Sequence, residues 1–105
     1  MSIRCNIKVV DHFQEPIWFY RHNDGNPEVM KPFLNKFLKR IEEGELRPCA
    51  KQSSGWLIIM GYEEYKQYQP DWKVGSIEPT AGEQGDIAYL YIVDVSNHTL
   101  EVIRK

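Results

Sequence analysis

The residues best suited to chemistry lie together at positions 20–27, where Arg21 and His22 follow an aromatic strand pattern and precede Pro27. Both side chains can carry positive charge, and they stand just before an expected helix. Helix N-termini expose unpaired N–H groups and a partial positive charge, so they bind anions. The segment is therefore interpreted as a candidate site for a phosphate or carboxylate, which Arg21 would bind through two hydrogen bonds.

Aromatic side chains extend this candidate site. Trp18, Tyr20 and His22 alternate along one strand face, whereas Arg21 belongs to the opposite face. Trp18, Tyr20 or Trp72 would stack on a nucleotide base. His22 would bond the ligand or act as an acid or base. The predicted ligand-binding residues are Arg21, His22, Asp24, Trp18, Tyr20 and Trp72.

The same segment also has an explanation that needs no ligand. Asp24 and Gly25 favour a turn, Asn26 suits a helix cap, and Pro27 suits the first helical position. Arg21 would then pair with a carboxylate such as Asp24, and its neighbour would be a structural histidine. The sequence alone leaves both explanations open.

Patterns for metals and for catalysis are weak. The histidines, His12, His22 and His98, lack the i, i+4 spacing of a helical zinc motif. The cysteines form no C-x-x-C pair, and both are expected to be free thiols. No P-loop, G-x-G-x-x-G or G-x-S-x-G motif occurs. We expect no cofactor and no metal, and we interpret the chain as non-catalytic.

Length and composition are those of an ordinary soluble protein. The 105 residues suit one domain, 1–105, with 42% hydrophobic and 27% charged residues. The net charge of −2 and a pI of about 5.9 predict no bulk attraction to nucleic acid or to anionic membranes. No apolar run is long enough to span a bilayer and no signal peptide is evident, so a cytoplasmic protein is expected.

Hydrophobic periodicity predicts the elements that position the candidate site. Alternation over residues 3–10 and the aromatic run 17–20 predict a hairpin. Apolar residues recur every three or four positions from Met30 to Ile41, which predicts an amphipathic helix beginning at Pro27. Pro32 conflicts with a continuous helix, so we expect a short first turn followed by a break.

The second half of the chain predicts a helix and another hairpin. Residues 44–51 are expected to form a loop, and residues 55–67 a helix, although 56–60 would also suit a buried strand. Residues 69–84 form a long irregular segment in this interpretation. Strands are expected at 86–95 and 99–104. The order strand, strand, helix, helix, strand, strand predicts an α+β fold, with an antiparallel sheet of about four strands and two helices packed on one face.

Two motifs resemble a group of small uncharacterised bacterial and bacteriophage proteins. They are Tyr20-Arg21-His22-x-Asp24-Gly25-x-Pro27 and Gly85-Asp86-Ile87-x-Tyr89-Leu90-Tyr91, with Trp56-Leu57-Ile58 between them. Asn23 and Asn26 stand where that group is expected to have aromatic residues. The resemblance implies a phage context, in which small proteins block host defence by binding a defence protein or by sequestering a nucleotide signal.

The leading expectation is a small binding protein for an anionic, nucleotide-like ligand, with segment 69–84 closing over the site or joining a homodimer. The alternative is a protein-interaction module that inhibits a host complex. It would use segment 69–84 or a basic helix face, Lys31, Lys36, Lys39 and Arg40. The third hypothesis is a phosphodiester-cleaving enzyme built on Arg21, His22 and Asp24.

Overall fold

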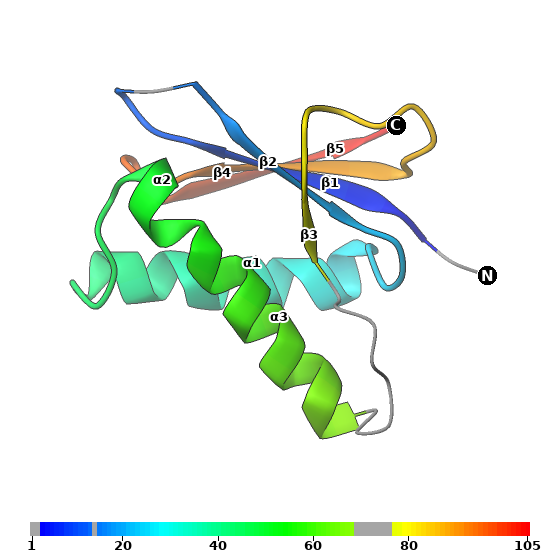
Figure 1. Cartoon of the computed structure of the whole chain (residues 1–105), viewed down its shortest axis with the longest axis horizontal. Coiled ribbons are helices and arrows are strands. Elements are labelled where there is room, and N and C mark those ends of the chain that lie inside the picture. Colours follow the sequence, from blue (N-terminus) through cyan, green and yellow to red (C-terminus); the bar gives the residue numbers. More distant parts are fainter. Residues whose placement is uncertain (1–2, 14, 69–76) are drawn as a thin grey trace.

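Five strands form one mixed sheet within residues 3–13, 15–68 and 77–105, which the computed structural model describes (Figure 1). They are β1 (Cys5–Val10), β2 (Ile17–Arg21), β3 (Glu78–Thr80), β4 (Tyr89–Asp94) and β5 (Thr99–Arg104). Their order across the sheet is β3-β2-β1-β4-β5. The α+β class is confirmed.

Strand pairing corrects the finer prediction of an antiparallel sheet of about four strands. Both expected hairpins form, β1 with β2 and β4 with β5. However, β1 and β4 are parallel, with Ile7 opposite Tyr91, and β3 adds a fifth strand beside β2. Parallel neighbours need a long crossover connection. The chain provides it by returning from the helices to β3 at one edge, then crossing to β4 on the other side of β1.

Helix α1 (Pro27–Glu42) runs without a break through Pro32, so the expected interruption is wrong. Pro32 is exposed, and it removes only one backbone donor from a long helix. The apolar face buries side chains on both sides of the proline, which keeps the two parts in line. Its buried residues are Met30, Phe33, Leu34, Phe37, Leu38 and Ile41.

Two further helices follow. The short α2 (Ala50–Ser53) occupies part of the expected loop, and α3 (Gly55–Tyr68) confirms the helical interpretation of residues 55–67. Asp11, in the β1–β2 turn, accepts a hydrogen bond from the Ala50 backbone N–H at 2.6 Å. This carboxylate therefore caps α2 from a distant part of the chain. None of the helices within the described residues is long and apolar enough to cross a membrane.

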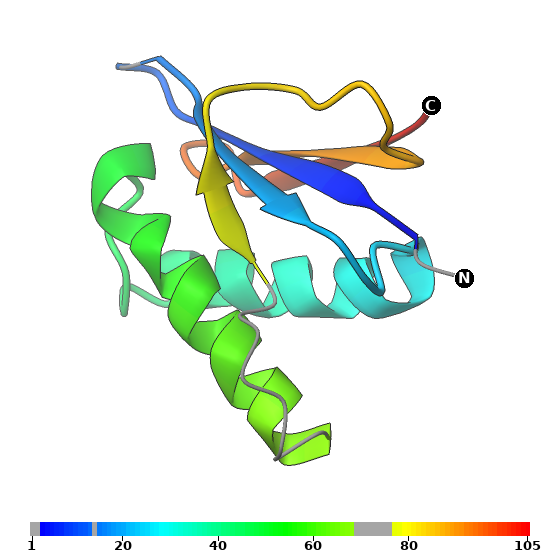
Figure 2. The same ribbon diagram turned by 45° about the vertical axis from the view of Figure 1, so that its right-hand side comes forward.

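The helices lie on one side of the sheet, and the core fills the space between (Figure 2). Tyr91 is fully buried there, and its hydroxyl donates to the Gly25 carbonyl oxygen at 2.7 Å. On the opposite face, the segment from β3 to β4 crosses the sheet. Asn6 ties it down, because its buried side chain accepts from the Gln84 N–H at 2.7 Å and donates to the Phe19 carbonyl at 2.9 Å.

Candidate functional site

Arg21 lies on the core face of β2 and is only 2% exposed. Its Nε donates to the Asn23 carbonyl oxygen at 2.8 Å, and its Nη1 lies 3.3 Å from the Met30 sulfur. The guanidinium carbon is 6.0 Å from the centre of the Phe33 ring, within cation–π range. Arg21 thus links the turn after β2 to α1, and the chain itself surrounds its charge.

The N-terminus of α1 also engages groups of the chain. Asn26 donates through its side chain to the Glu28 carboxylate at 2.7 Å, and its carbonyl accepts from the Met30 N–H at 3.0 Å. The hydrogen bond from Asn26, together with the backbone N–H of Glu28, lowers the pKa of Glu28. A carboxylate in the first turn offsets the positive end of the helix dipole. The place expected for a ligand anion therefore already carries the chain's own negative charge.

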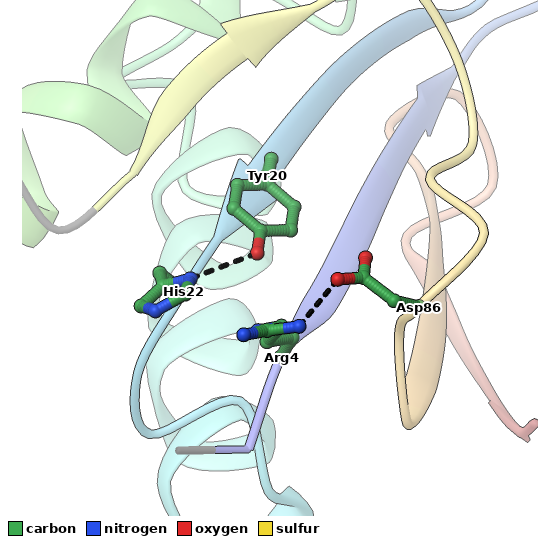
Figure 3. A network of polar contacts seen from close by, with 4 residues as sticks. All are labelled: Arg4, Tyr20, His22 and Asp86. Carbon is green, nitrogen blue, oxygen red and sulfur yellow. Dashed lines mark hydrogen bonds and ion pairs between the residues drawn. The ribbon is translucent and has the colours of Figure 1, made fainter.

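Four polar side chains converge instead at one end of the sheet (Figure 3). This sheet-end cluster consists of Arg4, Tyr20, His22 and Asp86. The Tyr20 hydroxyl lies 3.0 Å from Nδ1 of His22, and Arg4 forms an ion pair with Asp86. The register explains the convergence, because Cys5 in β1 lies opposite Arg21 in β2 and Tyr89 in β4. The start of β1, the end of β2 and the start of β4 thus lie together.

Charges around the sheet-end cluster are mixed. Burial raises the pKa of Tyr20, Arg4 opposes that rise, and the carboxylates of Asp86 and Glu78 add to it. Two carboxylates and one guanidinium therefore lie near the Tyr20 hydroxyl, so positive charge is not concentrated there. One donor of this cluster is unsatisfied, because the buried Nε of Arg4 has no hydrogen-bond partner among the described residues.

The remaining predicted residues are placed as follows. Trp18 shares the outer sheet face with Tyr20, and the Lys8 ammonium lies 5.4 Å from the centre of its ring. Asp24 is exposed, with a φ of 58°, in the turn before α1. Trp72 lies outside the described residues. The structure therefore brings Trp18, Tyr20 and His22 to one face and buries Arg21 on the other.

A second surface was not singled out from the sequence. Trp56, Ile59 and Tyr62 of α3 are 40%, 45% and 54% exposed. Their spacing of three residues puts them on one helix face, which we name the α3 stripe. Leu57 and Met60, on the side of α3 turned toward the rest of the protein, are buried.

The sequence does carry a signal for the α3 stripe. Residues 56–62 are apolar except for Gly61, so the first two turns of α3 are apolar on every side. A helix at the surface of a domain can bury only one side, and an apolar helix therefore leaves apolar side chains exposed. The apolar pattern alone does not separate the two sides of α3, because Ile59 and Met60 are both apolar and only Met60 is buried.

Charged residues line a hollow next to α3. A hollow of about 190 Å³ lies between α1 and α3. Its lining residues are Phe33, Lys36 and Arg40 of α1, and Met60, Glu63 and Glu64 of α3. Basic side chains thus stand on one wall and acidic side chains on the other, above an apolar floor.

No family model matches the chain, and neither the curated proteins nor the solved structures searched contain a match. The functional argument therefore starts from the chain's own residues.

Proposed function

We propose that the chain is a non-catalytic protein-interaction module that binds its partner through the α3 stripe. The observation that carries this proposal is the exposure of Trp56, Ile59 and Tyr62 on one helix face, at 40%, 45% and 54%. Clustered exposed apolar side chains are typical of protein-binding surfaces, and Trp and Tyr are enriched among the residues that dominate binding energy. Side chains at this spacing suit a helix that lies in a partner's apolar groove.

The charged neighbours of the stripe support the same proposal. Protein interfaces combine an apolar centre with a polar rim, and rim charges mainly steer encounter and orientation. Glu63 lies one helical turn after Ile59, and Lys36 and Arg40 of α1 line the same hollow as Glu63 and Glu64, so charges of both signs lie near α3. The resemblance to phage proteins directs the search for the partner to host defence proteins, in keeping with an inhibitor of a host complex.

The test is affinity capture from a lysate of the host cell, with Ile59→Glu as the main variant. Because Ile59 is 45% exposed, this change should alter the free energy of unfolding by no more than about 0.5 kcal/mol. It should nevertheless remove a specific partner, since it places a charge at the centre of the interface. Phe13→Ser is the matched control, because Phe13 is 81% exposed but lies in the β1–β2 turn.

The expected result is one protein that the wild type and Phe13→Ser both capture and Ile59→Glu does not. Equal capture by all three chains would contradict the proposal. A protein lost only with Phe13→Ser would move the binding surface to the β1–β2 turn.

A second proposal is that the sheet-end cluster binds an anionic, nucleotide-like ligand. The specific observation is the unpartnered Nε of Arg4, next to the Tyr20–His22 pair. A phosphate would have to replace Asp86 at Arg4, while Trp18 offers a ring on the same face for stacking. No comparable observation favours phosphodiester cleavage, because Arg21, which that hypothesis requires, is buried.

Thermal unfolding with a panel of nucleotides, cyclic nucleotides and sugar phosphates tests this second proposal. Ligand at a hundredfold excess over its Kd stabilises a protein by about 2.7 kcal/mol. The shift should disappear in Arg4→Gln and persist in Lys31→Gln, a change on the exposed face of α1. An unchanged midpoint across the whole panel would contradict ligand binding and leave the first proposal unaffected.

A further inference from the structure

The two edges of the sheet differ in a way that matters for pairing. Edge strands carry free N–H and C=O groups that can pair with another strand, and proteins commonly block them with short strands or proline. Strand β3 has three residues and contains Pro79. Strand β5 has six residues and no proline. One edge is thus blocked, while the other remains suited to pairing.

The hydrogen bonds of β5 show which backbone groups face outward. The Lys105 N–H donates to the Ala88 carbonyl at 2.8 Å, so the backbone of Lys105 points toward β4. Alternate residues of an antiparallel strand point their backbone groups in opposite directions. The backbone N–H and C=O groups of Leu100, Val102 and Arg104 therefore point away from β4. Within the described part of the chain, these groups have no backbone partner.

A hollow of about 520 Å³ lies along α1 at the beginning of β5. Its lining residues are Asn35, Leu38, Lys39, Glu42 and Glu43 of α1, together with His98. Glu43 lies 3.9 Å from Lys39, whereas Glu42 has no ion pair among the described residues. At the other end of β5, Arg104 is exposed, and it too has no ion pair among the described residues. A hollow that contains a carboxylate without an ion pair in the described part of the chain thus lies at one end of the open strand, and a cation lies at the other.

We propose that β5 pairs in antiparallel fashion with β5 of a second copy of this chain, with Val102 opposite Val102. This register places Leu100 opposite Arg104 of the second copy. The three outward-facing residues of each strand would then exchange backbone hydrogen bonds with the other strand. The result is one continuous sheet across both copies.

Charge complementarity selects the second copy and this register. Leu100 and Arg104 belong to the face that α1 covers, because they lie opposite Val93 and Tyr89. Directly opposed residues share a face, so Arg104 of the second copy extends toward the hollow containing Glu42 and Glu43. The C-terminal end of α1 also favours a cation there.

Because the pair of copies is symmetric, the contact between Arg104 and the hollow of the other copy forms twice. Moving the register so that Glu101 lies opposite Glu101 would instead bring two carboxylates together, which is unfavourable.

Sedimentation equilibrium of the full chain over a range of concentrations tests the proposal. The wild type should dimerise, and Val102→Pro should weaken dimerisation by at least about tenfold, because proline removes an outward N–H. Val102→Thr keeps that N–H and should still dimerise. Circular dichroism checks that the variants keep their fold. A monomeric wild type, or an unchanged dimer in Val102→Pro, would overturn the proposal.

A charge exchange tests the register independently. Arg104→Glu alone, and Glu42→Lys with Glu43→Lys, should each be mainly monomeric, because each creates two repulsive contacts in a symmetric pair. Mixed together, the two variants should form a one-to-one dimer, since both contacts again join opposite charges. If the mixture stays monomeric while the wild type dimerises, the proposed register is wrong. The α3 stripe is a different surface, so partner capture should be the same for all these variants.

Discussion

Arg21 stands in the most suggestive motif of the sequence, yet the structure gives it internal partners. Strand alternation separated Arg21 from Tyr20 and His22, and the structure agrees. Which of the two faces the helices would cover was not predictable, because both carry large apolar side chains, Phe19 on one and Trp18 on the other. A local pattern specifies alternation, whereas burial depends on elements that come from elsewhere in the chain.

Replacing Arg21 tests its internal role. Arg21→Ala should lower the free energy of unfolding by about 2–4 kcal/mol, because it removes a packed side chain and its hydrogen bond to the Asn23 carbonyl. His22→Ala, at an exposed position, should lower it by less than about 1 kcal/mol. Urea unfolding measures both. Equal, small effects would mean that Arg21 contributes little to stability and is available for another role.

Gly25 is required because the backbone approaches closely at this position. A Cβ there would lie 2.8 Å from the Ile3 carbonyl oxygen and 2.9 Å from the Cβ of Cys5. Gly25→Ala should therefore lower the free energy of unfolding by about 1–3 kcal/mol. Gly55→Ala is the control, because a Cβ meets nothing within 4 Å and alanine favours helix. Thermal unfolding should show a lower midpoint for the first variant alone.

Two buried acids make stability depend on alkaline pH. Burial raises the pKa of the Cys5 thiol from 9.0 to about 12, and nearby Arg21 only partly opposes this. Burial also raises the pKa of the Tyr91 phenol above its ordinary value of 10.0. As the pH rises, the unfolded chain therefore loses these two protons before the folded chain does. The free energy of unfolding should therefore be unaffected by these groups below about pH 9 and should fall above it.

The fall should approach about 1.4 kcal/mol per pH unit for each group. Urea unfolding at a series of pH values from about 8 to 10.5 measures it, since this interval spans the ordinary thiol value. Tyr91→Phe should show a shallower fall, and Cys49→Ser the same fall as the wild type. Constant stability across this interval would contradict the burial argument.

At the scale of elements, strong periodicity predicted most helices and strands. The amphipathic pattern of α1 and the apolar run of β4 were sufficient for both. The parallel pairing of β1 with β4 could not be predicted in this way. Each hairpin has local sequence signals, but the relative direction of the two hairpins depends on the connection between them. Strand β3 was missed because it is short and contains Pro79, a residue that argues against a strand.

Helix α2 depends on a distant cap. Asp11→Ala should lower the free energy of unfolding by about 1–2 kcal/mol, because the Ala50 N–H loses its acceptor. Asp11→Asn keeps an acceptor oxygen and should recover much of that loss. Chemical unfolding of the three chains measures the series. If Asp11→Asn is as unstable as Asp11→Ala, the charge of Asp11 stabilises α2, and not the hydrogen bond to its N-terminus.

At the scale of the whole molecule, the helix-covered side and the sheet edge offer separate surfaces. Helix α3, which carries the α3 stripe, belongs to the helical layer, while β5 lies at one edge of the sheet (Figure 1). Of the candidate site, the sequence predicted the common face of Trp18, Tyr20 and His22. It did not single out Arg4, which the β1–β2 hairpin brings to the end of β2, or Asp86, which joins that face only through the parallel β1–β4 pairing. The exposure of the α3 stripe also depends on tertiary packing.

The measurement that most directly tests the proposed function is site-specific photocrosslinking inside the host cell. A photoreactive phenylalanine analogue replaces Ile59 or Tyr62 in the stripe, or Lys31 on the exposed face of α1 as a control. We predict that both stripe positions crosslink to the same host protein and that position 31 does not. Crosslinks that are equal at all three positions, or absent from the stripe, would contradict the proposal that α3 binds a partner protein.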